Sequence, residues 1–315
     1  MSGAEPGIVA VVVTFESGAM IERCLRSLQQ AAPVRGIDIR VVDNASVDDS
    51  VARAAGIVGA DHVLRLPVNR GFAAGVNAVL SGFTGPWLAV INPDVLLPPG
   101  ALDALVDRLE RDARAGLVGP RVRDPRGALE ESIGWFPTLA RERAHALYLD
   151  VLLGRGGRRR RAFPASAEAV DWLSGCAWVL RGEATREVGP LDEEYFMYFE
   201  DVDYCWRLRA AEWTVVADPQ VEILHGGSMG SARSHEQPAD GAGPPLLRFF
   251  AKFQPEARPA DVIAALVTGW RVRLLLHTVA GWLGDSRARM RASRYQSALK
   301  LARHPRRLTP PGSID

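Results

Sequence analysis

The sequence predicts an α/β fold in which a mainly parallel central sheet is flanked by helices, with a helical extension at the C-terminus. Three observations predict it. Apolar runs rich in β-branched residues alternate with segments whose apolar residues recur at helical spacing, polar turns follow the predicted strands, and the C-terminal part combines an apolar stretch with many basic residues. Because the 315 residues exceed one typical domain, we expect one large α/β domain with an appendage.

Strand and helix alternate from the N-terminus onward. Residues 8–14 form a continuous apolar run typical of a buried parallel strand, and residues 37–42 form a second strand. The segment between them has one apolar stripe at helical spacing, formed by Ile21, Cys24, Leu25 and Leu28. The polar turn at residues 43–50 is rich in Asp, Asn and Ser, so we expect it to cap the next helix.

The same alternation continues toward the middle of the chain. Residues 62–66 predict a third strand, residues 73–81 a helix, and residues 87–91 a fourth strand that ends at the segment Asn92-Pro93-Asp94. A further helix is predicted by a core-facing stripe of Leu102, Leu105, Val106 and Leu109. This alternation favours a parallel sheet covered on both faces, with ligands bound at the carboxyl ends of the strands.

The net charge of +1 conceals a strong asymmetry. Ten Lys or Arg residues and a single acid, Asp285, lie between residues 271 and 307, and residues 155–161 contain five arginines. Such basic blocks suit an anionic surface. The three cysteines are too few and too scattered for a disulfide framework or a zinc cluster, so we expect reduced core thiols at Cys24, Cys176 and Cys205. No basic region followed by an apolar core opens the chain, and we therefore expect a cytoplasmic protein.

Polar groups gather where the predicted strands end. Neither a Gly-x-Gly-x-x-Gly fingerprint nor a Walker loop follows the first strand, which disfavours a dinucleotide-dependent dehydrogenase and a P-loop enzyme. Asp43 is suited to accept hydrogen bonds from a base or ribose, and Arg70 beside Gly71 is suited to approach a phosphate. Each residue alone is typical of a turn or a cap. Together the strand ends indicate a nucleotide site formed by Thr14, Asp43, Asn69, Arg70, Gly71 and Asp94.

An acidic cluster follows an aromatic run at residues 195–199. One carboxylate of the cluster is suited to act as a general base toward an attacking hydroxyl, and a second is suited to hold a hard cation on a leaving diphosphate. Acids at a helix N-terminus also arise simply because they complement the helix dipole. A solvated helix cap needs no aromatic residues before it. The cluster therefore favours group transfer from an activated nucleotide. Its members are Glu200, Asp201 and Asp203.

Six motifs occur in a fixed order: VVVT at 11–14, VVDNAS at 41–46, NRGFAAGVN at 69–77, NPD at 92–94, WLSG at 172–175 and FMYFEDVD at 196–203. On these motifs the chain, over residues 9–227, resembles the inverting family 2 glycosyltransferases of GT-A fold. Within that family it resembles bacterial rhamnosyltransferases that act on lipid-linked acceptors. The resemblance implies a GT-A nucleotide-diphospho-sugar transferase fold.

The resemblance also implies residue roles. Asp201 is then the catalytic base, and Asp94 ends the Asp-x-Asp metal motif, which His225 completes around a divalent cation, Mn²⁺ or Mg²⁺. One departure is that Asn92 replaces the first carboxylate of this motif; an amide orients ribose or a metal-bound water but removes one negative charge. Imidazole suits manganese better than magnesium, although His225 also fits a histidine satisfied at a strand end. The implied nucleotide-sugar residues are Thr14, Asp43, Asn69, Arg70, Gly71, Asn92 and Asp94.

The three acids of the cluster do not all serve one site. In a helix of 3.6 residues per turn, Glu200 points about 100° and Asp203 about 200° away from Asp201. We therefore interpret Asp203 as a cap or structural ion pair and Glu200 as a residue that positions the acceptor or the base. In a single displacement, the base would accept the proton of the acceptor hydroxyl while the nucleoside diphosphate leaves from the opposite face.

The acceptor side is expected in the later half of the chain. Trp172 and Tyr198 offer flat apolar faces for a pyranose, and Ser174-Gly175 allows close backbone approach. A tryptophan on a sheet is more often a core residue, but the neighbours of Trp172 match the family motif. Trp135 has no such neighbours.

Residues 262–283 are apolar enough to suggest a transmembrane helix. Because Arg271, Arg273 and His277 lie in the middle of this segment, we instead expect an interfacial helix. With the basic tail it predicts a peripheral protein at the inner face of the plasma membrane, bound to anionic lipid. The alternative is a helical hairpin that mediates a homodimer. No nucleic-acid motif accompanies the basic tail, so we expect no nucleic-acid partner.

The predicted organisation is a GT-A catalytic domain at residues 1–230 and a basic helical extension at 231–315. Within the domain, residues 1–115 form the nucleotide-sugar half and residues 116–230 the acceptor-binding and catalytic half. The predicted function is metal-dependent, inverting transfer of L-rhamnose from dTDP-L-rhamnose to a hydroxyl of a lipid-linked (polyprenyl diphosphate) or other cell-envelope saccharide. One alternative is a UDP-sugar donor. The other is a nucleotide-sugar-binding protein without turnover; Asn92 favours this second alternative, and the retained Asp94, Asp201 and His225 disfavour it.

Overall fold

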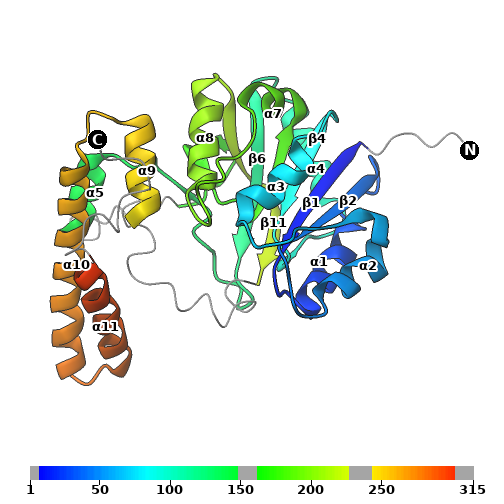
Figure 1. Ribbon diagram of the computed structural model, residues 1–315. Coiled ribbons are helices and arrows are strands. Elements are labelled where there is room, and N and C mark those ends of the chain that lie inside the picture. The colour runs from blue at the N-terminus through cyan, green and yellow to red at the C-terminus, as the bar shows by residue number, and fades with distance from the viewer. Residues whose placement is uncertain (1–6, 148–161, 227–242, 302–315) are drawn as a thin grey trace, which may run out of the picture. The chain divides into compact units, whose positions relative to one another are not determined.

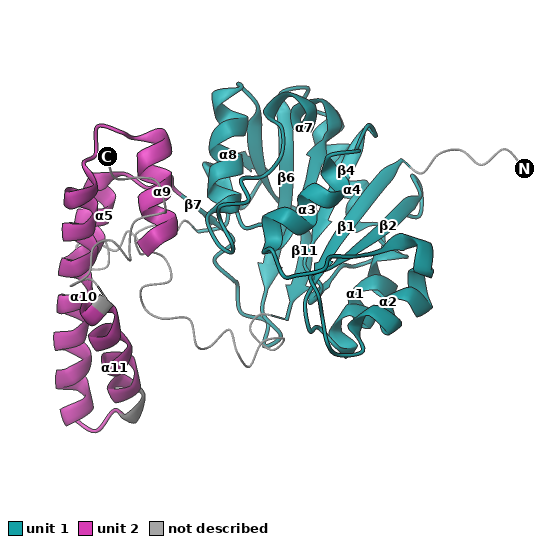
Figure 2. Cartoon of the chain, in the orientation of Figure 1, with its two compact units in different colours: residues 1–134, 161–232 teal, residues 135–160, 233–315 magenta. Residues whose placement is uncertain are grey.

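The computed structural model describes residues 7–147, 162–226 and 243–301. The chain divides into two compact units: unit 1 comprises residues 1–134 and 161–232, and unit 2 comprises residues 135–160 and 233–315 (Figure 2). Residues 135–160, which the sequence grouped with the acceptor half, thus cluster with the C-terminal helices. Their helix α5 (Leu139–Ala146) packs on α10 (Pro259–Trp282), where Gly269 leaves room for Ala146. The arginine block at 155–161 lies outside the described residues.

Unit 1 contains the parallel sheet that the sequence predicts (Figure 1). Strands β1 (Ile8–Thr14), β2 (Ile37–Asp43), β3 (Val63–Arg65) and β4 (Trp87–Ile91) lie in the order β3-β2-β1-β4, and every pair among these neighbours is parallel. Thr14 pairs with Asp43 in register. The carboxyl ends of β1 and β2 are therefore level, and both present polar residues at the same edge.

The second half of the sheet is mixed. Strand β10 (Ala177–Arg181) runs antiparallel between β4 and β6 (Ala115–Arg123), and β11 (Thr214–His225) returns parallel to β6. Strands β5 (Val95–Leu96) and β8 (Glu168–Ala169) pair antiparallel with β11. A separate two-stranded sheet joins β7 (Ile133–Gly134) to β9 (Trp172–Leu173).

Helices pack on this sheet through the predicted apolar stripes. The stripes of α1 (Ala19–Leu28) and α4 (Ala101–Glu110) are buried in one core with β1, β4 and β6. In α3 (Phe72–Leu80), Gly75 has no room for a side chain, since a Cβ there would lie 2.5 Å from Cγ1 of Val13. The remaining described helices of unit 1 are α2 (Ser50–Val58), the short 3₁₀ helix η1 (Ala60–His62), α7 (Gly182–Val188) and α8 (Glu200–Ala210). The three predicted core thiols are confirmed as buried and free.

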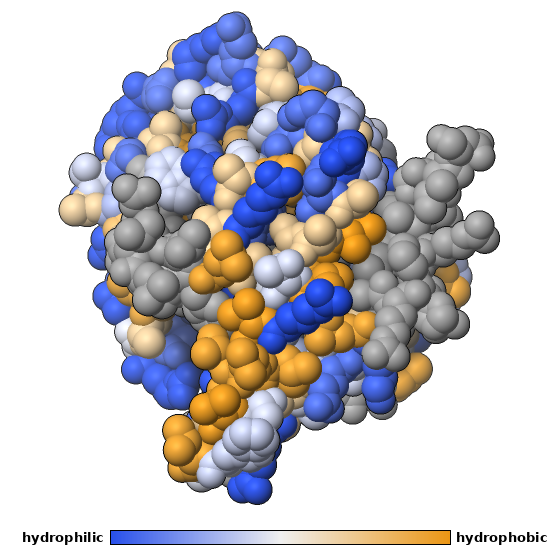
Figure 3. Space-filling model, turned by 90° about the vertical axis from the view of Figure 1, so that its left-hand side faces the viewer, coloured by the Kyte–Doolittle hydropathy of each residue, from blue (hydrophilic) through white to orange (hydrophobic). Residues whose placement is uncertain are grey.

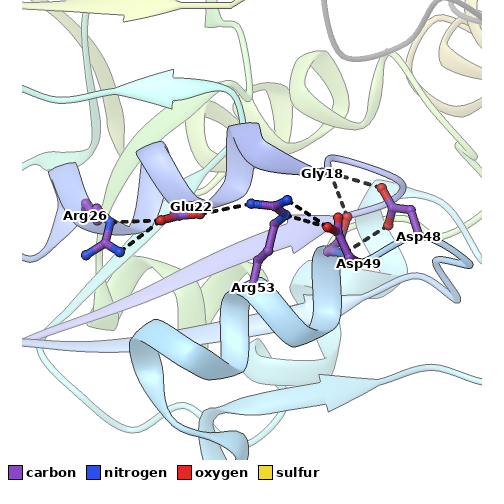
Figure 4. Close-up of polar contacts among 7 residues, drawn as sticks. Gly18, Glu22, Arg26, Asp48, Asp49 and Arg53 are labelled. Atoms are coloured by element: carbon purple, nitrogen blue, oxygen red, sulfur yellow. Dashed lines mark hydrogen bonds and ion pairs between the residues drawn. The ribbon is translucent and has the colours of Figure 1, made fainter.

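Polar contacts join the loops that follow β1 and β2 (Figure 4). Arg53 of α2 donates to Glu22 of α1 at 3.1 Å and pairs with Asp49 at 2.8 Å. The backbone N–H of Gly18 donates to the Ser50 hydroxyl at 2.9 Å. Ser50 thus supports the loop after β1. Asp49 makes no side-chain cap of α2, but Asp48 of the expected capping turn accepts from the Ser50 N–H at 3.1 Å.

Unit 2 consists of helices in its described part: α5, α9 (Gly243–Phe253), α10 and α11 (Ser286–Leu301). Phe249 of α9 is fully buried and stacks on Phe136 with ring centroids 6.4 Å apart. His277 of α10 stacks on Tyr295 of α11 at 5.7 Å. Helix α10 is the one described helix long and apolar enough to cross a membrane, by length and composition alone.

Candidate active site

The nucleotide half of the candidate site lies at the ends of β1 and β2. Thr14 and Asp43 are both buried there. The Thr14 hydroxyl donates to the Ser17 hydroxyl at 2.9 Å, while the Asp43 carboxylate accepts from the backbone N–H of Ser46 at 3.1 Å and lies 3.4 Å from the Arg65 guanidinium. A charge that is both buried and bonded in this way is held in one orientation. Asp43 is therefore a preorganised acceptor at the sheet edge.

The loop Asn69-Arg70-Gly71 leads into α3 and contacts Asn44, the residue after Asp43. The Asn69 side chain accepts from the Gly71 N–H at 3.0 Å, and Asn44 donates to the Gly71 carbonyl at 3.0 Å. Gly71 has φ 86°, and a Cβ there would lie 2.2 Å from the carbonyl oxygen of Phe196. Only glycine fits both constraints. The loop is therefore locked against the aromatic segment that precedes the acidic cluster.

Arg70 does not point freely toward a ligand. Its guanidinium pairs with Glu193 at 2.6 Å, and Glu193 also accepts from Asn77 of α3 at 3.0 Å. The Arg70 side chain is more than half exposed, so the pair is weak in water and opens readily. Contact between Arg70 and a phosphate requires that opening.

Asp94 and His225 meet although 131 positions separate them in the sequence. Strand β5 pairs with β11 so that Val95 lies opposite His225, which brings the Asp94 carboxylate within 3.3 Å of Nε2 of His225. The backbone N–H of Gly226 donates to the Asp94 carbonyl at 2.8 Å. Asn92 lies two residues before Asp94, and its backbone N–H donates to the Cys176 carbonyl at 2.8 Å.

Glu130 is a member of this cluster that the sequence did not indicate. Its carboxylate lies 2.8 Å from Nδ1 of His225, so the imidazole is held between two acids. Burial lowers the pKa of His225, but hydrogen bonds and charges from Asp94 and Glu130 outweigh it and raise the pKa to about 9. Glu130 belongs to no motif, and its position follows from the bridge between Arg123 and Leu129 beyond β6. No local pattern would have found it.

The Asp94 and His225 pair fits a divalent cation. Two ligands at adjacent corners of a coordination sphere lie about 3 Å apart when each is about 2.0–2.2 Å from the ion. The observed separation of 3.3 Å is close to this. Within the part of the chain that the structure describes, no group of three or more His, Cys, Asp or Glu residues is arranged to hold a metal. A cation bound here would complete its shell with ligand oxygens and water, as Mg²⁺ commonly does.

Asp201 lies in the first turn of α8. Its carboxylate accepts from the Gly175 N–H at 3.3 Å and from the Val202 N–H at 2.8 Å. The two residues before the helix, Tyr198 and Phe199, have positive φ values of 68° and 74°. Such conformations are strained for residues other than glycine and cluster at functional sites. The strained turn aims the start of α8 at the Gly175 loop.

The other two acids of α8 have distinct environments. Asp203 is fully buried and bonds Nε of Arg207 at 2.7 Å, which confirms the structural ion pair that the helical spacing predicts. Glu200 is only 7% exposed, and its Oε2 makes no hydrogen bond to any described residue. Burial, and then the charge of Asp201, raise the pKa of Glu200 well above its ordinary value. Both causes disfavour the charged form of the Glu200 carboxyl.

The buried thiol of Cys176 lies amid the cluster. Burial raises its pKa to about 12; a hydrogen bond with Ser174 acts in the opposite direction, and the nearby charges of Glu130, Asp94 and Asp201 raise the pKa further. The backbone on both sides of this residue links the two parts of the site, because the Gly175 N–H donates to Asp201 and the Cys176 carbonyl accepts from Asn92, two residues before Asp94.

The predicted acceptor residues border this cluster from two loops. Trp172 is half-buried in β9, and Ser174 donates its N–H to the Ser132 carbonyl at 2.7 Å. Tyr198 is about half exposed, as are Phe196 and Met197, so the segment before α8 presents an apolar surface. Trp135 belongs to unit 2.

Comparisons with known proteins show which family the chain belongs to. The family model for glycosyl transferase family 2 matches residues 9–162. The N-acetylglucosaminyl-diphospho-decaprenol L-rhamnosyltransferase of Mycobacterium tuberculosis (strain ATCC 25618 / H37Rv) is 36% identical over 230 residues, which cover 68% of this chain and 74% of the relative. Rhamnosyltransferase WbbL of Escherichia coli (strain K12) is 26% identical over 141 residues, covering 44% of this chain and 52% of WbbL.

Solved structures share the fold. Mannosyltransferase PcManGT from Pyrobaculum calidifontis, in complex with GDP-Man and Mn²⁺, matches with a TM-score of 0.59 at 18% identity and covers 95% of this chain and 86% of its own. GalNAc-T7 with UDP, GalNAc and Mn²⁺ matches with a TM-score of 0.52 at 13% identity, covering 69% and 43%. The predicted GT-A fold is confirmed. By the family match and the 36% identity to a relative that it covers broadly, the chain belongs to glycosyl transferase family 2 and is a glycosyltransferase.

Proposed function

We propose that this glycosyltransferase moves L-rhamnose, with inversion, from dTDP-L-rhamnose to a hydroxyl of a saccharide carried on a polyprenyl diphosphate. The observation that supports it most is the Gly175-Cys176 backbone, whose Gly175 N–H donates to Asp201 and whose Cys176 carbonyl accepts from Asn92, two residues before the Asp94 that meets His225. The 36% identical relative is named as an L-rhamnosyltransferase that acts on N-acetylglucosaminyl-diphospho-decaprenol, which supports the choice of donor sugar and acceptor.

Asp201 acts as the base in this proposal. Two backbone N–H groups, of Gly175 and Val202, hold its side chain in one direction. As the acceptor hydroxyl attacks the anomeric carbon and becomes acidic, Asp201 takes its proton, a contribution of about 10²–10⁴-fold for positioned bases. Glu200 precedes the base in the chain, and burial and the charge of Asp201 raise the pKa of its carboxyl. It positions the acceptor or the base.

The leaving group departs on the opposite side of the sugar. Asp94 and His225 would hold a divalent cation, Mn²⁺ or Mg²⁺, which supplies charge neutralisation to the departing diphosphate. Asp43, Thr14 and the loop of Asn69, Arg70 and Gly71 bind the nucleoside part, with Asn92 orienting ribose or water. Trp172, Ser174, Gly175 and Tyr198 receive the acceptor saccharide.

The remaining assignments follow the same proposal. Residues 1–230 act as the catalytic domain, with a nucleotide-sugar half at 1–115, and the basic extension at 231–315 associates with the inner face of the plasma membrane. The competing role for that extension is a homodimer contact. One observation favours a site without turnover: Asn92 in place of a carboxylate lowers the negative charge available to a cation.

A donor panel tests the proposal. The purified protein is assayed with dTDP-L-rhamnose, UDP-sugars and GDP-mannose on a short-chain, water-soluble N-acetylglucosaminyl-diphospho-prenol, with and without Mn²⁺, and the product linkage is read by NMR. We expect transfer from dTDP-L-rhamnose, stimulated by the cation, with an anomeric configuration opposite to that of the donor. Transfer from a UDP-sugar alone would contradict the donor, and binding of dTDP without transfer would support the site without turnover.

A further inference from the structure

Helix α10 changes its environment along its length. Its first half is buried in unit 2, through Val262, Ala265, Leu266, Gly269 and Trp270. Its second half presents large apolar side chains to solvent: Leu275 (65% exposed), Leu276 (49%), Val279 (42%), Trp282 (83%) and the following Leu283 (84%). Only 28% of the most apolar 18-residue stretch of α10 is buried. The helix is therefore not enclosed as the core helix of an ordinary soluble unit is. We name these five exposed residues the α10 stripe.

The α10 stripe occupies one side of the helix. At about 100° per residue, its five members fall within an arc of about 120°. His277 and Gly281 lie on the opposite side of α10 and face α11. His277 stacks on Tyr295 of α11, and a Cβ at Gly281 would lie 2.6 Å from Cγ of Arg289 of α11. The stripe therefore faces away from the helix that packs on α10. Figure 3 shows a band of hydrophobic residues that continues to the lower end of this face of the molecule.

The helical hairpin that carries the stripe is strongly basic. From residue 262 to residue 301 it contains one acid, Asp285, against seven basic residues: Arg271, Arg273, Arg287, Arg289, Arg291, Arg294 and Lys300. Asp285 is engaged locally, because its carboxylate accepts from the Ala288 N–H at 3.1 Å. Arg271 and Arg291 are exposed. A partner for this surface must be apolar where it meets the stripe and anionic around it.

These observations distinguish two kinds of partner. A second copy of the chain would bring another basic hairpin against this one, and like charges at an interface oppose association. An anionic lipid monolayer meets both requirements, since its acyl boundary takes apolar side chains and its headgroups attract Lys and Arg. Trp282 at the end of the helix has the amphipathic ring that is enriched at membrane interfaces.

We propose that the α10 stripe inserts into the surface of a membrane rich in anionic lipids while α10 stays within unit 2. The helix does not cross the bilayer, because Arg273 donates to the Gly269 carbonyl at 3.1 Å and also contacts His145 of α5, and α11 covers the opposite side. Helix α11, which carries most of the basic residues, packs on α10, and the axes of packed helices lie about 8–10 Å apart, which is about one Debye length at 0.1 M salt. Insertion would hold the enzyme beside the lipid-linked acceptor of the proposed function. Only this purpose rests on the proposed function, and the insertion itself does not.

Vesicle flotation of the full chain, without substrates, tests the insertion. Vesicles contain phosphatidylcholine either alone or mixed with phosphatidylglycerol. Removal of the two most exposed apolar side chains, in Trp282→Ser/Leu283→Ser, should reduce binding to the mixed vesicles by about tenfold or more. The matched control is Val34→Ser/Val47→Ser, which removes two side chains of unit 1 that are 81% and 86% exposed. The control should bind as the unaltered protein does.

The charge contribution has its own variant. Arg271→Gln/Arg291→Gln should weaken binding to the anionic vesicles several-fold at low salt and have little effect at high salt. Brominated lipids should quench tryptophan fluorescence of the unaltered protein, and most of that quenching should disappear in Trp282→Phe. These two readouts separate headgroup attraction from insertion.

The proposal fails if the unaltered protein ignores anionic vesicles, or if Trp282→Ser/Leu283→Ser binds them equally well. It also fails if sedimentation in lipid-free buffer shows a dimer that this variant converts to a monomer while vesicle binding is unchanged, since the stripe is then a self-association surface. Transfer to the short-chain soluble acceptor should stay unchanged in the variant. If the unaltered protein binds vesicles but transfers no sugar to that acceptor, the proposed function fails and the membrane surface stands.

Discussion

The orientation of His225 depends on its contacts with two carboxylates. The imidazole bonds Glu130 through Nδ1 and faces Asp94 through Nε2. A carboxylate on the far nitrogen of a histidine fixes its tautomer and its direction toward a metal. Glu130 therefore orients His225, although the sequence identified only the other two members of the cluster. The missing signal is physical, because Glu130 reaches His225 through tertiary folding of the loop after β6.

The raised pKa of His225 links stability to pH when no metal is bound. The pKa is about 9 in the folded chain and 6.5 ordinarily, so the stabilising contribution is fully present below pH 6.5 and is lost as the pH rises through 9. Its size is on the order of 2 kcal/mol, given about 1.4 kcal/mol per pKa unit and partial solvent screening. Urea denaturation with chelator across this range should show His225→Gln losing less stability than the unaltered chain. Parallel losses would contradict the two-carboxylate environment.

The proposed metal pair makes a second prediction at this scale. Asp94→Ala should weaken the Mn²⁺-dependent part of dTDP binding by about tenfold or more, because it removes one of two protein ligands. Glu130→Gln should weaken it less, since the amide still restrains the imidazole. Isothermal titration calorimetry with and without Mn²⁺ measures both. Asp61→Asn, an exposed carboxylate of η1, is the control, and unchanged affinity in Asp94→Ala would show that the cation site is elsewhere.

At the scale of elements, the donor loop and the segment before α8 are joined. The Phe72 N–H donates to the Phe196 carbonyl at 3.2 Å, Gly71 fits against the same carbonyl, and Arg70 pairs with Glu193. The loop that would hold the nucleotide thus supports the turn that aims Asp201. A displacement of one element should be felt by the other.

Gly71→Ala tests this connection. The new Cβ would lie 2.2 Å from the Phe196 carbonyl, so the backbone must shift. We expect a loss of about 1–3 kcal/mol of stability and a larger loss of turnover than of nucleotide affinity. The control is Gly36→Ala, where φ is 71° but no atom lies within 4 Å of the new Cβ. Equal stability losses, with turnover intact in both variants, would show that the two elements are independent.

The sequence predicted elements unequally. The first four strands and the helices α1, α3 and α4 follow the predictions within one or two residues, because buried parallel strands and one-sided helices have strong periodic signals. Strands β6 and β10 were not predicted, and β11 was indicated only by its end, as one interpretation of His225. Their pairings are antiparallel or shifted by irregularities between residues 214 and 222, and long-range pairing of this kind leaves no local period.

At the scale of the whole molecule, sequence and structure divide the chain differently. The compositional boundary near residue 230 separates the basic helices, but residues 135–160 also belong to unit 2. A helix inserted from the middle of the chain has no compositional mark, and its packing depends on contacts such as that between Gly269 and Ala146. Deletion of α10 would uncover α5, so point variants of the α10 stripe separate anchoring from folding better than truncation.

The central claim is that unit 1 holds a working inverting active site in which Asp201 is the base. The direct measurement is Asp201→Asn, with transfer from dTDP-L-rhamnose to the soluble acceptor and dTDP binding determined on the same preparation. The amide keeps the shape of the side chain but does not accept the proton, so turnover should fall by about 10²–10⁴-fold with nucleotide affinity nearly unchanged. Turnover within a few-fold of the unaltered enzyme would contradict the assignment of the base and the mechanism built on it.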